Sequence, residues 1–93
     1  MSDVKIVVDL NGFVRETDVV IIEDNNVKEK HRISVDNIST QLASLAFSYA
    51  ANKLYLYGSK AYCCPIVEEI DYVAKTHYGY NNLEIEVITK WFI

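Results

Sequence analysis

The 93-residue sequence has few residues that break or loosen a fold, with one proline and three glycines. This scarcity argues against linkers and low-complexity segments. No apolar run approaches the roughly 20 residues of a membrane span. The start of the chain, MSDVKIVVDL, lacks the basic and apolar segments of a signal peptide. We therefore expect one domain, residues 1–93, located in the cytoplasm and without a membrane partner.

Cysteine is also scarce, and the two cysteines, Cys63 and Cys64, are adjacent. A reducing compartment keeps such thiols reduced, and their spacing matches no zinc site. They lie near the expected start of a helix, where the helix dipole lowers a thiol pKa. A nucleophile also needs a base, and we expect His77 at the far end of the same helix, on its apolar face. We therefore expect at least one cysteine to fill the core, and we predict no catalytic residue and no cofactor.

Positive charge is in short supply, because the formal net charge is −4. Lys28, Lys30 and Arg32 form the densest basic cluster, and neighbouring acids dilute it. A protein that binds nucleic acid usually carries a basic patch. The pattern is instead typical of a solvated edge strand, and it disfavours nucleic acid as a partner.

The hydrophobic pattern predicts an α/β fold in which five segments alternate with period two and two segments have a helical period. The predicted strands are Val4–Leu10, Phe13–Ile22, Val27–Ile33, Leu54–Tyr57 and Leu83–Ile88. One predicted helix has an apolar face from Ile38 to Tyr49, and Ser34, Asp36 and Asn37 are competent N-caps for it. The other runs from roughly Lys60 to Tyr78 and ends at Gly79. Because of Pro65, either its first turn is irregular or the regular helix begins near Cys64 with Pro65 at N1. Asn11-Gly12 predicts the first hairpin turn.

The order of these elements predicts the topology. Two hairpins join the first three strands, and right-handed crossovers then place both helices on one face of the sheet. The predicted five-stranded mixed sheet has the order 3-2-1-4-5, with the second strand antiparallel to the others. This βββαβαβ arrangement resembles the ribonuclease H-like fold of ribonuclease H, integrases, junction resolvases and actin-like kinases. The chain also looks like small bacteriophage and prophage proteins, which would make it a phage accessory protein.

The resemblance implies specific positions for metal-binding acids. The nucleases of this fold place an Asp in the middle of the first strand, and Asp9 in VVDLNG matches that position. They place a second acid at the end of the fourth strand, where this chain has Tyr57, Gly58 and Ser59. The third acid comes from a helix, and the first helix here has none. Asp9 is therefore a weak metal candidate, and a degenerate metal-dependent nuclease is the alternative function.

Two further segments resemble phosphate-binding loops only in part. DLNG, residues 9–12, looks like a reduced form of the phosphate loop of actin-like kinases, which bind nucleotide between two domains. Gly58-Ser59 precedes a helix and could present backbone N–H groups to an anion. It lacks the further glycines and the lysine of a P-loop, so a turn and a helix cap explain both residues more simply.

Alternation leaves one face of the predicted sheet without a cover. If Leu54 and Leu56 face the helices, Tyr55 and Tyr57 face the other way. The chain also ends in Trp91, Phe92 and Ile93, three large apolar residues. Tyrosine is enriched at protein interfaces. We therefore expect a non-enzymatic protein-interaction module that uses these five residues to bind a partner protein or itself, as a homodimer or larger homo-oligomer. The alternative is that residues 91–93 fold back and cover the sheet of their own chain.

Overall fold

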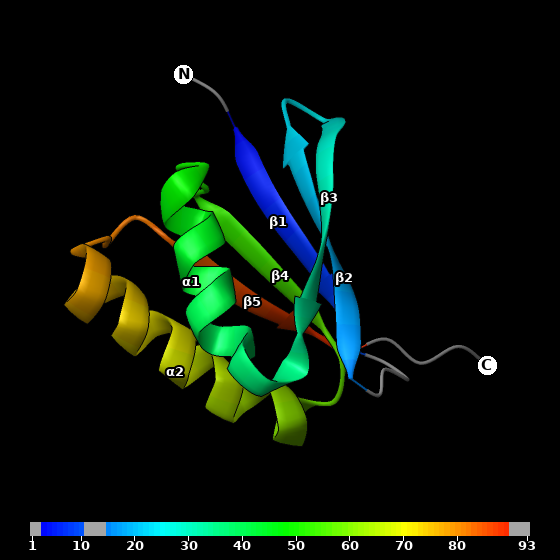
Figure 1. The fold of residues 1–93 in the computed structure, drawn as a ribbon, viewed down its shortest axis with the longest axis vertical. Coiled ribbons are helices and arrows are strands. Elements are labelled where there is room, and N and C mark those ends of the chain that lie inside the picture. Colours follow the sequence, from blue (N-terminus) through cyan, green and yellow to red (C-terminus); the bar gives the residue numbers. More distant parts are fainter. Residues whose placement is uncertain (1–2, 11–14, 90–93) are drawn as a thin grey trace.

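The computed structural model describes residues 3–10 and 15–89 (Figure 1). Within them the elements follow the predicted order βββαβαβ. They are β1 (Val4–Asp9), β2 (Glu16–Glu23), β3 (Asn26–Ser34), a 3-10 turn (Val35–Asn37), α1 (Ile38–Ser48), β4 (Lys53–Tyr57), α2 (Lys60–Tyr78) and β5 (Glu84–Ile88). The predicted strands match these bounds within a few residues. The Asn11-Gly12 turn and the predicted start of a strand at Phe13 lie outside the described residues.

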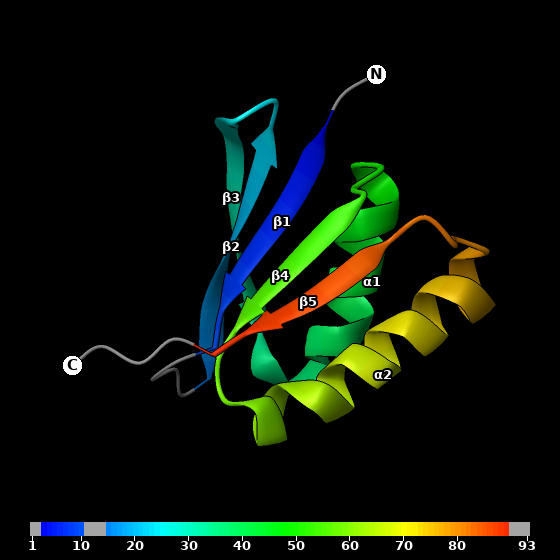
Figure 2. The same cartoon turned by 180° about the vertical axis from the view of Figure 1, so that it is seen from behind.

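The strands form one mixed sheet in the order β3-β2-β1-β4-β5. β2 runs antiparallel to β1 and β3, whereas β1, β4 and β5 are parallel. Both helices cover the same face of the sheet (Figure 1), and the opposite face is uncovered when viewed from behind (Figure 2). The predicted topology is confirmed, and β1 is the central strand.

The core lies between the sheet and the two helices. Alternate residues of the three inner strands point into it, and six of them are fully buried: Ile6, Val8, Val19, Ile21, Leu54 and Leu56. Leu42 of α1 and Ile70 of α2 close the core from the other side, also fully buried. Burying each such side chain contributes about 1.5–3 kcal/mol.

The helix ends follow from local chemistry. The Ser59 side chain caps α2 by accepting a hydrogen bond from the Tyr62 N–H at 3.3 Å. Gly79 ends α2 with φ of +62°, a left-handed conformation that favours glycine. Of the candidate caps before α1, Ser34 uses its side chain, which accepts from the Asp36 N–H at 3.2 Å and starts the 3-10 turn. α2 keeps its predicted bounds and continues through Pro65.

One predicted core position is wrong. His77 is exposed, and the aromatic residue that packs at this end of α2 is Tyr78, whose ring stacks on Phe47 of α1 with centroids 5.0 Å apart. The reason is the length of α2, whose C-terminal end extends past the sheet (Figure 2). The last turn therefore packs on α1 instead of on strands. No helix in residues 3–10 and 15–89 is long and apolar enough to cross a membrane.

Candidate functional site: the open face of the sheet

The face of the sheet opposite the helices, which we call the open face, is built by strand register. Paired residues on neighbouring strands share a face. The register pairs Lys30 with Val20, Val20 with Val7, Val7 with Tyr55, and Tyr55 with Glu86. These five residues, one from each strand, form a row across the full width of the sheet. We call it the central row.

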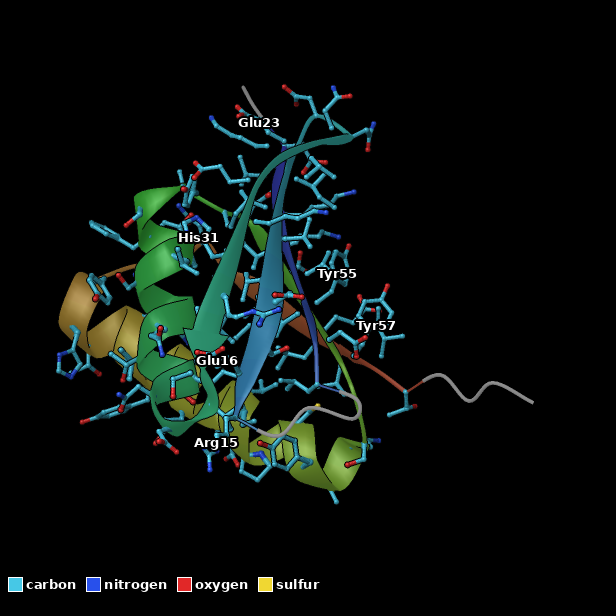
Figure 3. All side chains as sticks on the ribbon, turned by 45° about the vertical axis from the view of Figure 1, so that its right-hand side comes forward. Arg15, Glu16, Glu23, His31, Tyr55 and Tyr57 are labelled. Atoms are coloured by element: carbon cyan, nitrogen blue, oxygen red, sulfur yellow. The ribbon has the colours of Figure 1, made fainter. Side chains whose placement is uncertain are left out.

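The middle of the open face is apolar. Tyr55 and Tyr57 alternate with the fully buried Leu54 and Leu56 along β4 and are half-buried. Both tyrosines point away from the helices, as predicted (Figure 3). The other half-buried apolar residues that share this face by register are Val7, Val20, Ile22 and Ile88. We call these six residues the apolar patch.

Charges of opposite sign flank the apolar patch. Lys30 and Arg32 lie on the edge strand β3, and Glu84 and Glu86 lie on the other edge strand, β5. Arg32 Nε donates to Asp18 Oδ1 at 3.1 Å. All four flanking side chains belong to exposed residues, so the predicted solvated edge strand is confirmed for β3. Along the central row the open face therefore has a basic end, an apolar centre and an acidic end. Other charged residues, Lys5, Asp9, Asp18 and Lys53, lie on the same face on either side of that row.

Comparison with known proteins supports the fold and nothing finer. No family model and no curated sequence matches the chain. A solved structure of the Aquifex aeolicus PPX-GPPA enzyme matches 96% of this chain with a TM-score of 0.50 and 10% identity. A second structure, of the Aquifex aeolicus member of the Ppx/GppA family, matches with a TM-score of 0.48 and 12% identity. This chain spans 36% of the length of each.

The strand order and the placement of both helices on one face decide the fold class. The chain has the ribonuclease H-like fold. Because this likeness is one of topology at low sequence identity, it assigns no activity. The chemistry of this chain therefore depends on its own residues at these positions, which include Asp9, Tyr57 and Gly58-Ser59.

Asp9 lies at the end of β1, exposed on the open face. Its partner in the parallel register is Tyr57 of β4, so a phenol stands where nucleases of this fold place a second acid. The Thr17 hydroxyl donates to the Asp9 carbonyl oxygen at 2.6 Å and fixes the end of β1 against β2. In the described part of the chain, no three His, Cys, Asp or Glu side chains group so that they could hold a metal ion.

Gly58-Ser59 forms a turn and a helix cap, as the simpler interpretation predicts. Gly58 is buried, and a Cβ added to it would lie 3.0 Å from Cys63 Sγ and 3.3 Å from Leu10 Cβ. Its N–H donates to the Ile88 carbonyl oxygen at 3.2 Å, and Ser59 caps α2. Glycine therefore allows close packing here between Leu10 after β1, the end of β4 and α2.

The two cysteines have different environments. Cys63 is fully buried and Cys64 is exposed, which confirms that at least one of them fills the core. Burial raises the pKa of the Cys63 thiol, and the neighbouring Cys64 adds to this effect. The expected lowering of the pKa by the helix dipole is therefore overridden at Cys63, because a charged thiolate is disfavoured in an apolar site. Cys63 is a neutral core side chain.

This difference predicts the order of thiol modification. In the native protein, iodoacetamide at neutral pH should alkylate Cys64 readily and leave Cys63 unmodified for as long as the fold persists. Mass spectrometry of peptides should show modification at Cys64 alone, and at both residues after denaturation in urea. A Cys64→Ser variant should remain unmodified under native conditions. Rapid alkylation of that variant would contradict the burial of Cys63.

A polar cluster that the sequence does not predict joins β3 to α1. The Tyr49 hydroxyl donates to Glu29 Oε2 at 2.5 Å and lies 3.1 Å from His31 Nε2. The hydrogen bond to Glu29 raises the pKa of Tyr49, so the phenol stays neutral near pH 7. His31 also lines an open cavity of about 410 Å³ together with Thr40 and Gln41. The cluster residues pair with one another, which fastens the edge strand to the helix.

No local pattern could have revealed this cluster, because Glu29 and Tyr49 are 20 positions apart. The remaining predicted binding residues, Trp91, Phe92 and Ile93, lie outside the described residues. β5 ends at Ile88, which pairs with Tyr57.

Proposed function

We propose that this chain is a non-enzymatic protein-interaction module that binds a protein, either a partner or another copy of itself, through the open face. The observation that carries the proposal is the central row. It crosses all five strands, has an apolar centre and charged ends, and lies directly above a fully buried layer. Such a surface is rigid, because the strands that present it are fixed by the core.

The composition of the apolar patch supports a protein as the ligand. Tyr55 and Tyr57 offer large apolar rings with polar tips, which interfaces favour. Exposed acids at one edge, Glu84 and Glu86, repel the phosphates of a nucleic acid. Trp91, Phe92 and Ile93, three large apolar residues at the end of the sequence, are part of the proposed interface.

The test is substitution on the open face with a matched control. Tyr55→Glu combined with Tyr57→Glu places two charges in the apolar patch, whereas Tyr72→Glu places one on the outer side of α2, where Tyr72 is 63% exposed. We expect the double variant to weaken association by at least about tenfold. The Tyr72→Glu variant should associate like the wild type. A third variant that lacks residues 91–93 should lie between them.

Association is measured by light scattering over a concentration series and by calorimetry with any partner purified from the source cells. The result that counts against the proposal is association that survives the double tyrosine change and fails in Tyr72→Glu. Cleavage of nucleic acid in manganese would also contradict it, provided that the cleavage disappears in Asp9→Asn. Cleavage that depends on Asp9 would favour the nuclease alternative instead.

A further inference from the structure

The charges at the two ends of the central row are arranged so that the row complements itself. β1 is the central strand of five, with β2 and β4 on either side of it and β3 and β5 at the edges. In the central row, Lys30 lies at one end and Glu86 at the other, each two strands away from Val7. The row therefore has a basic half and an acidic half about its own centre.

We propose that the open face binds a second copy of this chain, stacked face to face about a two-fold axis that runs along β1. This inference rests on the proposed function and names its partner. Such an axis places β3 of one copy over β5 of the other, and β2 over β4. Lys30 of each copy then meets Glu86 of the other, Val20 meets Tyr55, and Val7 meets its own copy. One symmetric contact thus uses every residue of the central row.

Lys30 and Glu86 differ from several charged residues near them in their lack of an ion pair among the described residues. Across the described ranges, Lys30 and Glu86 form no ion pair, whereas the neighbouring Lys28 pairs with Glu23 at 2.7 Å and Arg32 with Asp18 at 3.1 Å. Both residues are exposed at opposite edges of the sheet. Stacked sheets align within about 30° of each other, so long Lys and Glu side chains remain within reach of their partners after this rotation.

The same axis also places two charged residues of β1, Lys5 and Asp9, near the identical residues of the other copy. Lys5 and Asp9 lie on the open face of β1 on either side of Val7. Lys5 Nζ lies 3.6 Å from Asp3 Oδ2, which offsets its charge, and Asp9 is at the exposed end of the strand. An axis perpendicular to the strands would instead oppose Lys30 to Lys30 and Glu86 to Glu86. The axis along β1 pairs opposite charges at both ends of the central row, whereas Arg32 falls over Ile88 and Glu84 over Val27 of the other copy.

The size of the surface sets the expected strength of the dimer. Five strands of about five residues, about 4.8 Å apart, present roughly 400 Å² of flat area. Two copies therefore bury roughly 800 Å² of flat area in total, which is below the roughly 1,200 Å² of stable specific complexes and in the range of weak, transient ones. We expect a reversible dimer with a dissociation constant in the micromolar range, and not an obligate one.

The test reverses one charge at a time. In Lys30→Glu, two acids oppose each other at both ends of the contact, and in Glu86→Lys two bases do. Each variant alone should dimerise at least about tenfold more weakly than the wild type. An equimolar mixture should recover the wild-type affinity as a heterodimer, because residue 30 of one variant then meets the opposite charge at residue 86 of the other. The double variant should recover it as a homodimer.

Sedimentation velocity from about 1 µM to about 1 mM covers the expected range, and circular dichroism checks that each variant is folded. Single variants that dimerise like the wild type overturn the proposed axis. A wild type that stays monomeric overturns the dimer but leaves the proposed function standing for a foreign partner. A dimer that also ignores Tyr55→Glu and Tyr57→Glu overturns both, because its contact then lies elsewhere.

Discussion

Leu56→Ala should lower the free energy of unfolding by about 2–5 kcal/mol. Leu56 is fully buried in β4, next to the central strand, and faces both helices. Removing its branched end leaves a cavity, because the sheet and the helices cannot close in without losing other contacts. Urea denaturation followed by circular dichroism measures the change.

The matched control is Tyr57→Ala, one residue along the same strand and on the opposite face. Tyr57 is half-buried on the open face, so we expect a smaller loss of stability, about 1 kcal/mol. For association we expect the opposite order. Tyr57→Ala should weaken association more than Leu56→Ala does, under conditions where both variants are folded. An equal loss of stability for the two variants would mean that the open face is covered by its own chain.

Gly58→Ala should destabilise the fold by about 1–3 kcal/mol, because the new methyl group has no room. It would lie 3.0 Å from the buried Cys63 Sγ, which cannot move away without displacing its core neighbours. Chemical denaturation of the single variants and of Gly58→Ala combined with Cys63→Ala forms a double-mutant cycle. The double variant should lose clearly less than the sum of the single losses, since removing the sulfur makes room for the methyl group.

Gly79→Ala is the control for this cycle. Nothing lies within 4 Å of a Cβ at Gly79, but its φ is +62°, so the cost there is backbone strain of about 1–2 kcal/mol. Cys63→Ala should not relieve that strain. Strict additivity in the Gly58 cycle would show that the clash with Cys63 is not the source of the destabilisation.

Local rules account for most of the fold. Period-two alternation located β1 and β4, and it assigned Leu54 and Leu56 to the core and Tyr55 and Tyr57 to the open face. α2 has its predicted bounds because Ser59 and Gly79 carry cap chemistry that acts within a few residues. The handedness of crossovers then placed both helices on one face, because consecutive right-handed crossovers that run the same way along a sheet put their helices on the same side.

Errors arose where a position depends on the relative length or placement of elements. His77 has the spacing of a core residue, yet it is exposed because α2 extends beyond the sheet that it covers. At the cysteines, the prediction that at least one fills the core is confirmed by Cys63, whose pKa is raised because burial outweighs the helix dipole.

The sequence by itself determined the strands, the helices, which side chains of each strand share a face, and the excess of negative charge. These properties depend on periodicity and on caps, which act over a few bonds. Only the tertiary structure decided that Glu29 and His31 meet Tyr49, that Tyr57 stands beside Asp9, and that Lys30 and Glu86 end one row across five strands. Strand register pairs residues up to 48 positions apart, such as Asp9 and Tyr57, and it is set by the packing of the whole core, which no short segment encodes.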